Sequence, residues 1–275
     1  MEFTLALFIA VLLVALVCQY ISISVGTGYG IILTPLLLIL GFAPLQVVPA
    51  VLFSQFTGGM VGSVLHHRLG NIELGSKRDR QSSAKGRLGR LDCLLPRSND
   101  ARVIAILAVF GVVGVLVGVF TAVSIPQTVL EAYIGAVVLG VGLLVLVRRN
   151  RQSTFSWRSL TAIGLLGGFN KGISGGVYVV LAAGGQIIVG RETRSALGST
   201  TVAVTIVCAA GFIGYLLLGG DIYWMLLAAA SIGSVVAAPF AALTVRKVAA
   251  KKLKLAIGLV TTTLGIATLV RTFIS

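Results

Sequence analysis

Lys171 is the residue whose type and position most clearly indicate chemistry. It is the only charged residue in two glycine-rich stretches, 22–35 and 170–186, which interrupt otherwise apolar sequence. A charge inside an apolar membrane segment costs about 3 kcal/mol or more, so such a residue is a candidate functional group. We expect its ammonium group to neutralise an anionic substrate. The alternative is that Lys171 ends a short helix, where a cation complements the negative end of the helix dipole.

Glycine and hydroxyl residues are prominent in both stretches. Gly26, Gly28 and Gly30 stand at alternate positions, and each loosens a helix by about 1 kcal/mol relative to alanine. We therefore expect the helix to break and restart at 26–28, and again at 174–176, with free N–H groups directed at an anion. Close packing of helices on small residues is the alternative.

The two stretches correspond to each other in sequence. Aligning Tyr29 with Tyr178 places Gly26 on Gly175. Broken elements in corresponding places of two halves are the best sequence indication of a transporter's binding site. The sequence thus predicts one substrate site, near the middle of the membrane, where the two breaks converge.

The span after each break carries polar side chains in an apolar context. Gln55 follows the first break, and Ser199 and Thr200 follow the second. We expect these side chains to line the cavity and orient the substrate, and hydrogen bonding between helices is the alternative. The full set of expected substrate-binding residues is Ser24, Gly26, Thr27, Gly28, Tyr29, Gln55, Asn170, Lys171, Gly172, Ser174, Gly175, Gly176, Tyr178, Ser199 and Thr200.

The composition is that of an integral membrane protein. Of 275 residues, 57% are hydrophobic and 11% are charged, whereas soluble domains carry about a quarter charged residues. The net charge of +14 does not indicate nucleic acid, because nearly all basic residues stand in short connections between apolar runs. That distribution is typical of cytoplasmic loops in membrane proteins.

Apolar runs predict the helical elements. Runs of roughly 17 to 25 residues can cross a membrane, and those in this chain are 3–22, 45–67, 102–123, 127–147, 195–218, 222–245 and 253–273. Shorter runs beside the glycine-rich stretches are 27–41, 158–170 and 176–189. We expect the shorter runs to be half-helices or short tilted spans.

The basic residues predict the orientation in the membrane. Lys and Arg concentrate in the connections 68–102, 148–158, 191–194 and 246–254. If all ten elements cross the membrane, these connections lie in the cytoplasm and both termini lie outside. Re-entrant pairs in place of the short runs would give eight crossings with the same loop assignment.

The expected fold is an all-α integral membrane protein, multi-pass in the plasma membrane. Five elements per half is an odd number, so the halves 1–148 and 149–275 should form inverted-topology repeats, with short or broken helices at the midplane. The basic loop 68–102 is expected to be a flexible cytoplasmic segment in contact with anionic lipid. A regulatory or partner-binding role is the alternative for this loop.

Catalytic and metal sites are not indicated. The cysteines Cys18, Cys93 and Cys208 show no metal-ligand spacing, and we expect no metal and no other cofactor. No Asp or Glu lies well inside an apolar run, so the chain lacks residues for a membrane-embedded enzyme or a carboxylate proton relay. A transporter is therefore expected rather than an enzyme. Coupling through bound ions, facilitated export and a channel-like mode are all compatible with the sequence.

Sequence motifs in the two halves carry a resemblance to a known family. Gly-Thr-Gly-Tyr-Gly, Leu-Thr-Pro and Pro-Leu-Gln-Val-Val-Pro-Ala in the first half are echoed by Phe-Asn-Lys-Gly-Ile-Ser-Gly-Gly in the second. This pattern resembles the TauE/SafE family of sulfite and organosulfonate exporters. The chain departs from it at Tyr29 and Val177, where the family commonly has glycine.

The resemblance implies a transporter of a small sulfur-containing anion, such as sulfite, sulfoacetate or another sulfonate. Such transporters usually move their substrate outward across a prokaryotic cell membrane. The departures leave other small organic acids, and uptake instead of export, as alternatives. The expected partners are the anion and the lipid bilayer, without nucleic acid, and a homodimer is compatible with the sequence.

Overall fold

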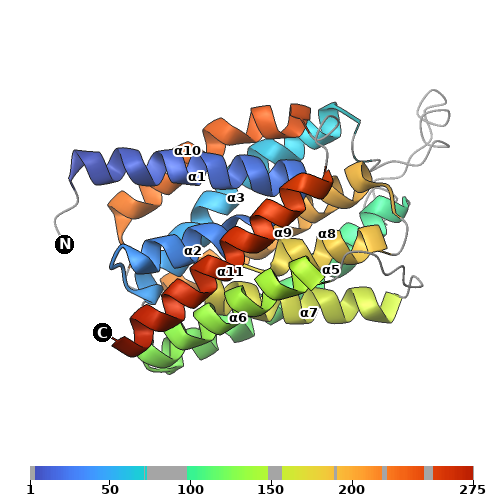
Figure 1. The fold of residues 1–275 in the computed structure, drawn as a ribbon. Helices are drawn as coiled ribbons and strands as arrows, with labels where there is room; N and C mark the ends of the chain where they lie inside the picture. Colours follow the sequence, from blue (N-terminus) through green and yellow to red (C-terminus); the bar gives the residue numbers. More distant parts are fainter. Residues whose placement is uncertain are drawn as a thin grey trace, which may run out of the picture.

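The protein is all-helical throughout the part described by the computed structural model. That part comprises residues 4–70, 72, 98–147, 157–188, 191–218, 222–244 and 250–274. It contains ten helices and no strand, which confirms the expected all-α class (Figure 1). Most of the basic loop 68–102 lies outside the described residues.

The helix bounds follow the predicted apolar runs to within a few residues. The helices are α1 (Leu5–Val25), α2 (Tyr29–Ile39), α3 (Pro44–Arg68), α5 (Asn99–Ser124), α6 (Gln127–Val147), α7 (Trp157–Ser174), α8 (Tyr178–Ile188), α9 (Thr193–Leu217), α10 (Trp224–Thr244) and α11 (Ala250–Ile274).

Within the described residues, six helices have the length and apolar composition needed to cross a membrane. They are α1, α3, α5, α6, α9 and α10. Helices α2 and α8 have 11 residues each, a length of about 16 Å, against a hydrocarbon core of about 30 Å. The protein is therefore a multi-pass membrane protein in which α2 and α8 are too short to cross alone.

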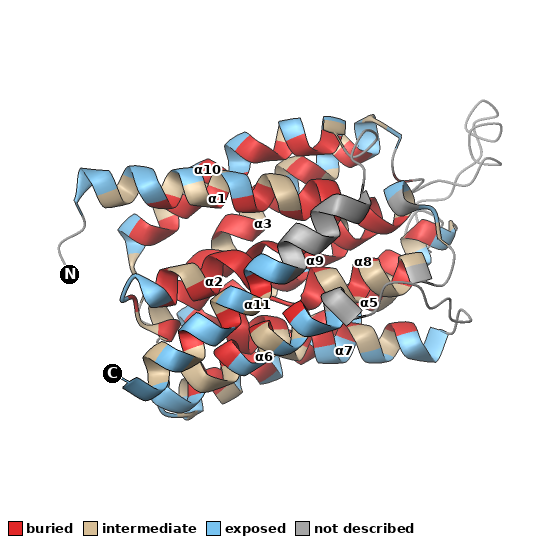
Figure 2. Ribbon diagram, viewed as in Figure 1, coloured by how far each residue is buried: buried red, intermediate tan, exposed pale blue. Residues whose placement is uncertain are grey.

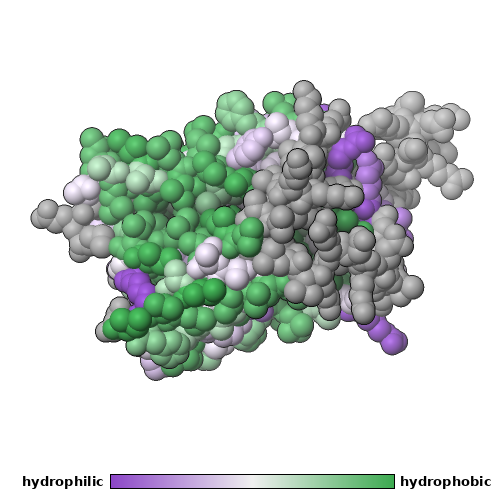
Figure 3. All heavy atoms as spheres, viewed as in Figure 1, coloured by the Kyte–Doolittle hydropathy of each residue, from purple (hydrophilic) through white to green (hydrophobic). Residues whose placement is uncertain are grey.

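Apolar side chains cover the outside of the bundle. On α1, Leu5, Ile9, Leu13 and Val17 recur every four residues and are all about half exposed or more. The outer helix faces are likewise exposed in Figure 2, and Figure 3 shows a broad hydrophobic surface over the described helices. This is the surface expected of helices that face lipid rather than water.

Helices of the two halves pack on each other in corresponding pairs. Helix α1 packs on α10 as α7 packs on α5, and α3 packs on α10 as α9 packs on α5. In the pairs α3 with α9 and α6 with α11, each helix packs on its own counterpart. Exchanging α1, α2, α3, α5 and α6 for α7, α8, α9, α10 and α11 reproduces these pairs. This agrees with two repeats, while their inverted relation stays a prediction.

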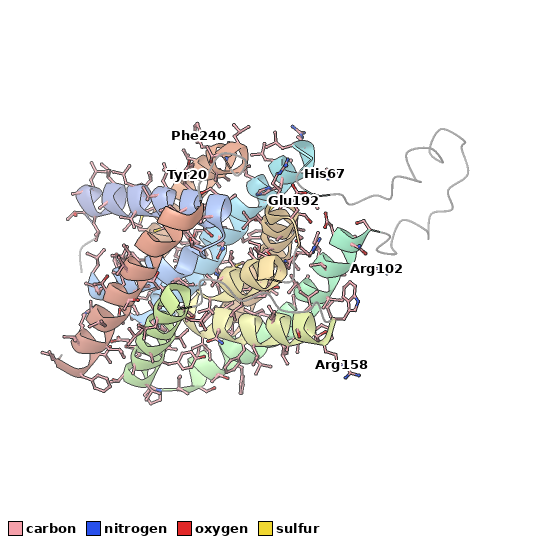
Figure 4. All side chains as sticks on the ribbon, turned by 45° about the vertical axis from the view of Figure 1, so that its right-hand side comes forward. Tyr20, His67, Arg102, Arg158, Glu192 and Phe240 are labelled. Atoms are coloured by element: carbon pink, nitrogen blue, oxygen red, sulfur yellow. The ribbon has the colours of Figure 1, made fainter. Side chains whose placement is uncertain are left out.

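The residues at the described ends of the basic connections gather at one end of the bundle. Figure 4 shows His67, Arg102, Arg158 and Glu192 at the same end. Both chain termini lie at the opposite end (Figure 1). The counting of Lys and Arg predicted that these two groups would lie on opposite sides.

Both helix breaks are shorter than the glycine-rich stretches. Helix α1 continues to Val25 because the N–H of Gly26 still donates to Ser22 O at 2.9 Å. Helix α7 continues to Ser174 because the N–H of Gly175 donates to Lys171 O at 3.0 Å. Helix α7 therefore extends four residues beyond the predicted run 158–170, and the break follows at the expected positions. Lys171 lies within the last turn of α7, as the alternative for this residue expected.

Candidate functional site

The two breaks have positive φ values at corresponding positions. Gly26 and Gly28 have φ values of 79° and 88°, and Gly175 and Val177 have φ values of 68° and 62°. These are the positions that coincide when Tyr29 is aligned with Tyr178. A left-handed conformation is natural for glycine, but it is a genuine outlier for the β-branched Val177. The first break thus has glycine at both positions of positive φ, whereas the second has one glycine and one strained valine.

The breaks lie directly against each other. A Cβ atom added to Gly30 would lie 1.9 Å from the carbonyl oxygen of Gly175. One added to Gly176 would lie 3.1 Å from the side chain of Ile31. Only a residue without a side chain permits this approach at Gly30. The convergence of the two breaks predicted from the sequence is thus present in the fold.

Lys171 reaches this junction from α7 and is 1% exposed. Its Nζ donates to Oε1 of Gln55 on α3 and to the carbonyl oxygen of Gly175 at the break. Both acceptors are uncharged, and no carboxylate in the described ranges forms an ion pair with it. A further N–H of the ammonium group has no acceptor among the described atoms. The site therefore buries the amino group of Lys171 without a carboxylate partner among the described residues.

Side chains of two further helices, α9 and α2, contact Gln55 and its neighbour on α3. Cys208 on α9 donates its thiol to Gln55 Oε1 at 3.8 Å. At the preceding position of α3, Ser54 Oγ lies 2.9 Å from the hydroxyl of Tyr29 on α2. Lys171 and Gln55 are therefore in direct contact, and Tyr29 contacts the residue next to Gln55. Their role in binding a substrate stays a prediction.

Two buried hydroxyl groups near the breaks have no hydrogen-bond partner among the described residues. They belong to Thr27 in the first break and to Thr34 on α2. Thr34 Oγ1 lies 3.0 Å from the place of a Cβ atom at Gly175, so it faces the second break. The sequence analysis did not select Thr34, although its Leu-Thr-Pro motif was a signal. Both hydroxyls could donate to a bound anion.

Three expected site residues contact neighbouring helices instead. The hydroxyl of Tyr178 donates to Leu107 O at 2.7 Å. Asn170 Oδ1 accepts from Tyr133 at 2.6 Å. A Cβ atom on Gly172 would lie 2.5 Å from Val115 O, so that glycine permits close packing of α7 on α5.

Two expected serines bond to the backbone of their own helices. Ser24 donates to Tyr20 O at 2.6 Å. Ser174 donates to Asn170 O at 2.8 Å and accepts from the N–H of Gly176 at 3.2 Å. Ser174 thereby stabilises the end of α7 and fixes the backbone of the break. Neither of these hydrogen bonds is to Lys171.

Ser199 and Thr200 belong to a second polar cluster. Ser199 donates to Gln186 Oε1 at 2.9 Å, and Gln186 Nε2 donates to Thr200 Oγ1 at 2.9 Å. Arg191 also donates to Gln186, at 2.6 Å. This cluster connects α8 and α9 and leads toward the basic end of the bundle. The sequence analysis missed Gln186, although it is the last residue of the second glycine-rich stretch.

A metal centre is not formed by the side chains that the structure describes. Within those ranges, no group of three or more His, Cys, Asp and Glu residues could hold an ion. Cys18 and Cys208 are free thiols and buried, and Cys93 lies outside the described residues. The polar groups that remain at the junction are nitrogen and hydroxyl donors, which suit an anion.

A multi-pass helical bundle with a buried charge between two broken helices is the architecture of a membrane transporter. The family model "Sulfite exporter TauE/SafE" matches residues 96–268, more than half of the chain. The protein belongs to this family of membrane transporters. The "Probable membrane transporter protein YtnM" of Bacillus subtilis (strain 168) is 22% identical over 248 residues, covering 85% of this chain and 73% of that protein. No solved structure matches the chain significantly.

Proposed function

We propose that this protein exports a small sulfur-containing anion, such as sulfite, sulfoacetate or another sulfonate, across the plasma membrane. The observation that carries the proposal is the ammonium group of Lys171, buried beside both breaks and paired only with uncharged oxygens. A buried charge without a counter-ion is costly. A bound anion would remove that cost. The family membership supports the choice of a sulfur oxyanion.

The donors at the junction fit the head group of such an anion. Sulfite and sulfonate present several oxygens that accept hydrogen bonds. The remaining N–H of Lys171 and the hydroxyls of Thr27 and Thr34 could donate to them. The carbonyl oxygen of Gln55 now occupies one donor of Lys171, so it would give way to the anion or share the ammonium group with it.

Alternating access accounts for how a site buried in the middle of the bundle exchanges with both sides. The two halves pack in corresponding pairs, and rocking of one half against the other would expose the junction to each side in turn. The basic connections lie in the cytoplasm by the positive-inside rule. Outward movement is the direction that the family description supports.

Ligand-induced stabilisation of the purified protein tests the substrate class. We expect sulfite or sulfoacetate to raise the melting temperature, and taurine and acetate to do so less. At about 100 times the dissociation constant, a ligand adds about 2.7 kcal/mol to the free energy of unfolding. Lys171→Gln removes the charge, and we expect it to abolish the shift. A sulfonate shift that survives in this variant would contradict Lys171 as the binding cation.

Gln55→Glu gives a sharper test of the same site. It places a carboxylate on the ammonium group of Lys171, and this internal counter-ion should exclude the substrate anion without unfolding the protein. Gln46→Glu is the matched control. It makes the same change on α3, about 13 Å along the helix, near the N-terminus where an acidic group is favourable. Equal sulfonate shifts in both variants would count against the proposed site.

Flux into vesicles separates the alternatives. Saturable transport of sulfite or sulfoacetate, lost in Gln55→Glu and kept in Gln46→Glu, is the expected result. Transport of acetate in preference to sulfoacetate would favour the small organic acids. Flux that does not saturate would favour a channel.

A further inference from the structure

An ion pair ties the corner between α8 and α9 to the start of α5. Arg191 lies in this corner and pairs with Asp100, in the first turn of α5. Ser195 strengthens the contact, because it donates to Asp100 Oδ1 at 2.6 Å and accepts from Arg191 at 2.9 Å. We refer to Asp100 and Arg191 as the charged corner contact. It lies at the basic end of the bundle, where Arg102 and Glu192 are also found (Figure 4).

An aromatic pair occupies the corresponding corner at the other end. The alignment of Tyr29 with Tyr178 places Phe42, between α2 and α3, on Arg191. The ring of Phe42 packs on that of Tyr223, immediately before α10, with centroids 5.9 Å apart. We refer to Phe42 and Tyr223 as the aromatic corner contact. Since α10 corresponds to α5, the two contacts join equivalent elements with different chemistry.

Each corner joins the two helices that enclose one of the breaks. A Cβ atom on Gly26 would lie 2.4 Å from Leu197 on α9 and 3.4 Å from Ala183 on α8. The first break is therefore held by the helices of the charged corner. Movement of this corner would move the wall of the first break.

The second break is held by the helices of the aromatic corner. A Cβ atom on Gly175 would lie 3.0 Å from Thr34 on α2 and 3.1 Å from Val51 on α3. With both contacts formed, Lys171 is 1% exposed and Cys208 is 0% exposed. The site is thus closed while both corners are closed.

We propose that the two corner contacts control access to the anion site, the charged contact from the basic end and the aromatic contact from the opposite end. This inference rests on the alternating access in the proposed function, but on no particular substrate. Breaking the Asp100–Arg191 pair frees the α8–α9 corner from α5 and opens the path from the basic end. Separating Phe42 from Tyr223 frees the α2–α3 corner from the start of α10 and opens the path from the opposite end, where the termini lie.

The native thiol of Cys208 reports which end is open, because it contacts Gln55 beside Lys171. The background is Cys18→Ala with Cys93→Ala, so that Cys208 alone reacts with a membrane-impermeant maleimide. We expect Arg191→Gln to raise the labelling rate from the basic end about fivefold or more, as for a coupling of about 1 kcal/mol. Phe42→Ala should raise it from the opposite end. Intact cells and inside-out vesicles present the two ends separately.

Exchange of the two charges tests the pair itself. Arg191→Asp combined with Asp100→Arg should return labelling from the basic end toward the rate of the background protein, and Cys208→Ser sets the zero. The proposal would be overturned if a variant raised the labelling rate equally from both ends, or if neither variant raised it. It would also be overturned if the charge exchange did not lower the rate again. The two variants could also raise the labelling rate from opposite sides of the membrane, but each from the side not expected. That result would support the corner contacts and refute the cytoplasmic placement of the basic end. Labelling needs no substrate, so failure of sulfonate binding does not affect this result.

Discussion

Val177 is the residue at which the second break departs most from its counterpart. It holds a φ of 62° with a β-branched side chain, where the first break has Gly28 at 88°. A left-handed conformation costs a non-glycine residue roughly 1–2 kcal/mol. Such strain persists only where the surrounding structure enforces it, and it is common at ligand sites. Val177 directly precedes α8, whose first turn adjoins the proposed anion site.

Comparing glycine with alanine at position 177 measures this strain. Both substitutions remove most of the valine side chain, so the difference between them isolates the backbone. We expect Val177→Gly to be more stable than Val177→Ala by about 1 kcal/mol in the free energy of unfolding. At Val179, a buried residue in the first turn of α8, the order should reverse by about the same amount. Thermal unfolding in detergent gives both differences, and the same order at both positions would argue against strain at Val177.

At the same scale, side chains that the sequence grouped into one site divide into two clusters. Lys171 binds Gln55 and the break at Gly175, whereas Ser199 and Thr200 bind Gln186. A sequence shows that a polar residue lies in a span, but it does not show which way that residue faces around the helix. That direction follows from the packing of neighbouring helices.

At the scale of elements, glycines bring α5 and α7 into close contact. Cβ atoms on Gly118 and Gly168 would lie 2.2 Å and 2.3 Å from carbonyl oxygens of the facing helix. Small residues at the contact between two membrane helices allow their backbones to pack closely. Because α7 carries Lys171, this contact also sets the position of the charge relative to Gln55.

Gly118→Ala should therefore disturb the site as well as the fold. The added methyl group meets the carbonyl oxygen of Phe169. Overpacking of this kind typically costs about 1–3 kcal/mol, so we expect the free energy of unfolding to fall by about that amount. Gly140 on α6 is the matched control, because a Cβ atom there meets nothing within 4 Å, and Gly140→Ala should be neutral or stabilising by up to about 1 kcal/mol. Thermal unfolding with and without sulfoacetate measures both effects. Equal stability of the two variants would refute the close contact.

For the whole molecule, the arrangement of the termini and the basic connections makes topology testable. Both termini lie at one end (Figure 1), and the residues next to the basic connections lie at the other (Figure 4). We expect a reporter that is active only outside the cytoplasm to work when fused at the C-terminus. The same reporter inserted between α6 and α7 should be inactive. Activity at both positions would contradict ten elements of alternating direction.

The sequence by itself determined the helices, the two breaks and the buried charge. Lipid offers no hydrogen-bond partners to the backbone, so the N–H and C=O groups of a membrane segment must bond to each other. Apolar runs of sufficient length are therefore helical. Glycines such as Gly26 and Gly175 mark the breaks because glycine disfavours a continuous helix, and their positive φ values in the structure agree. These features depend on neighbouring residues alone, which is why the predicted bounds agree with the structure to within a few residues.

Only the tertiary structure decided which distant residues meet. Lys171 and Gln55 are 116 positions apart, and Asp100 and Arg191 are 91 positions apart. Such pairs depend on how each helix is rotated and shifted against its neighbours, and small residues such as Gly30 and Gly118 set these close approaches. Hydrophobic patterning cannot supply that information in a protein whose inner and outer helix faces are both apolar. The site therefore emerges from helix packing, although its charge could be read from the sequence.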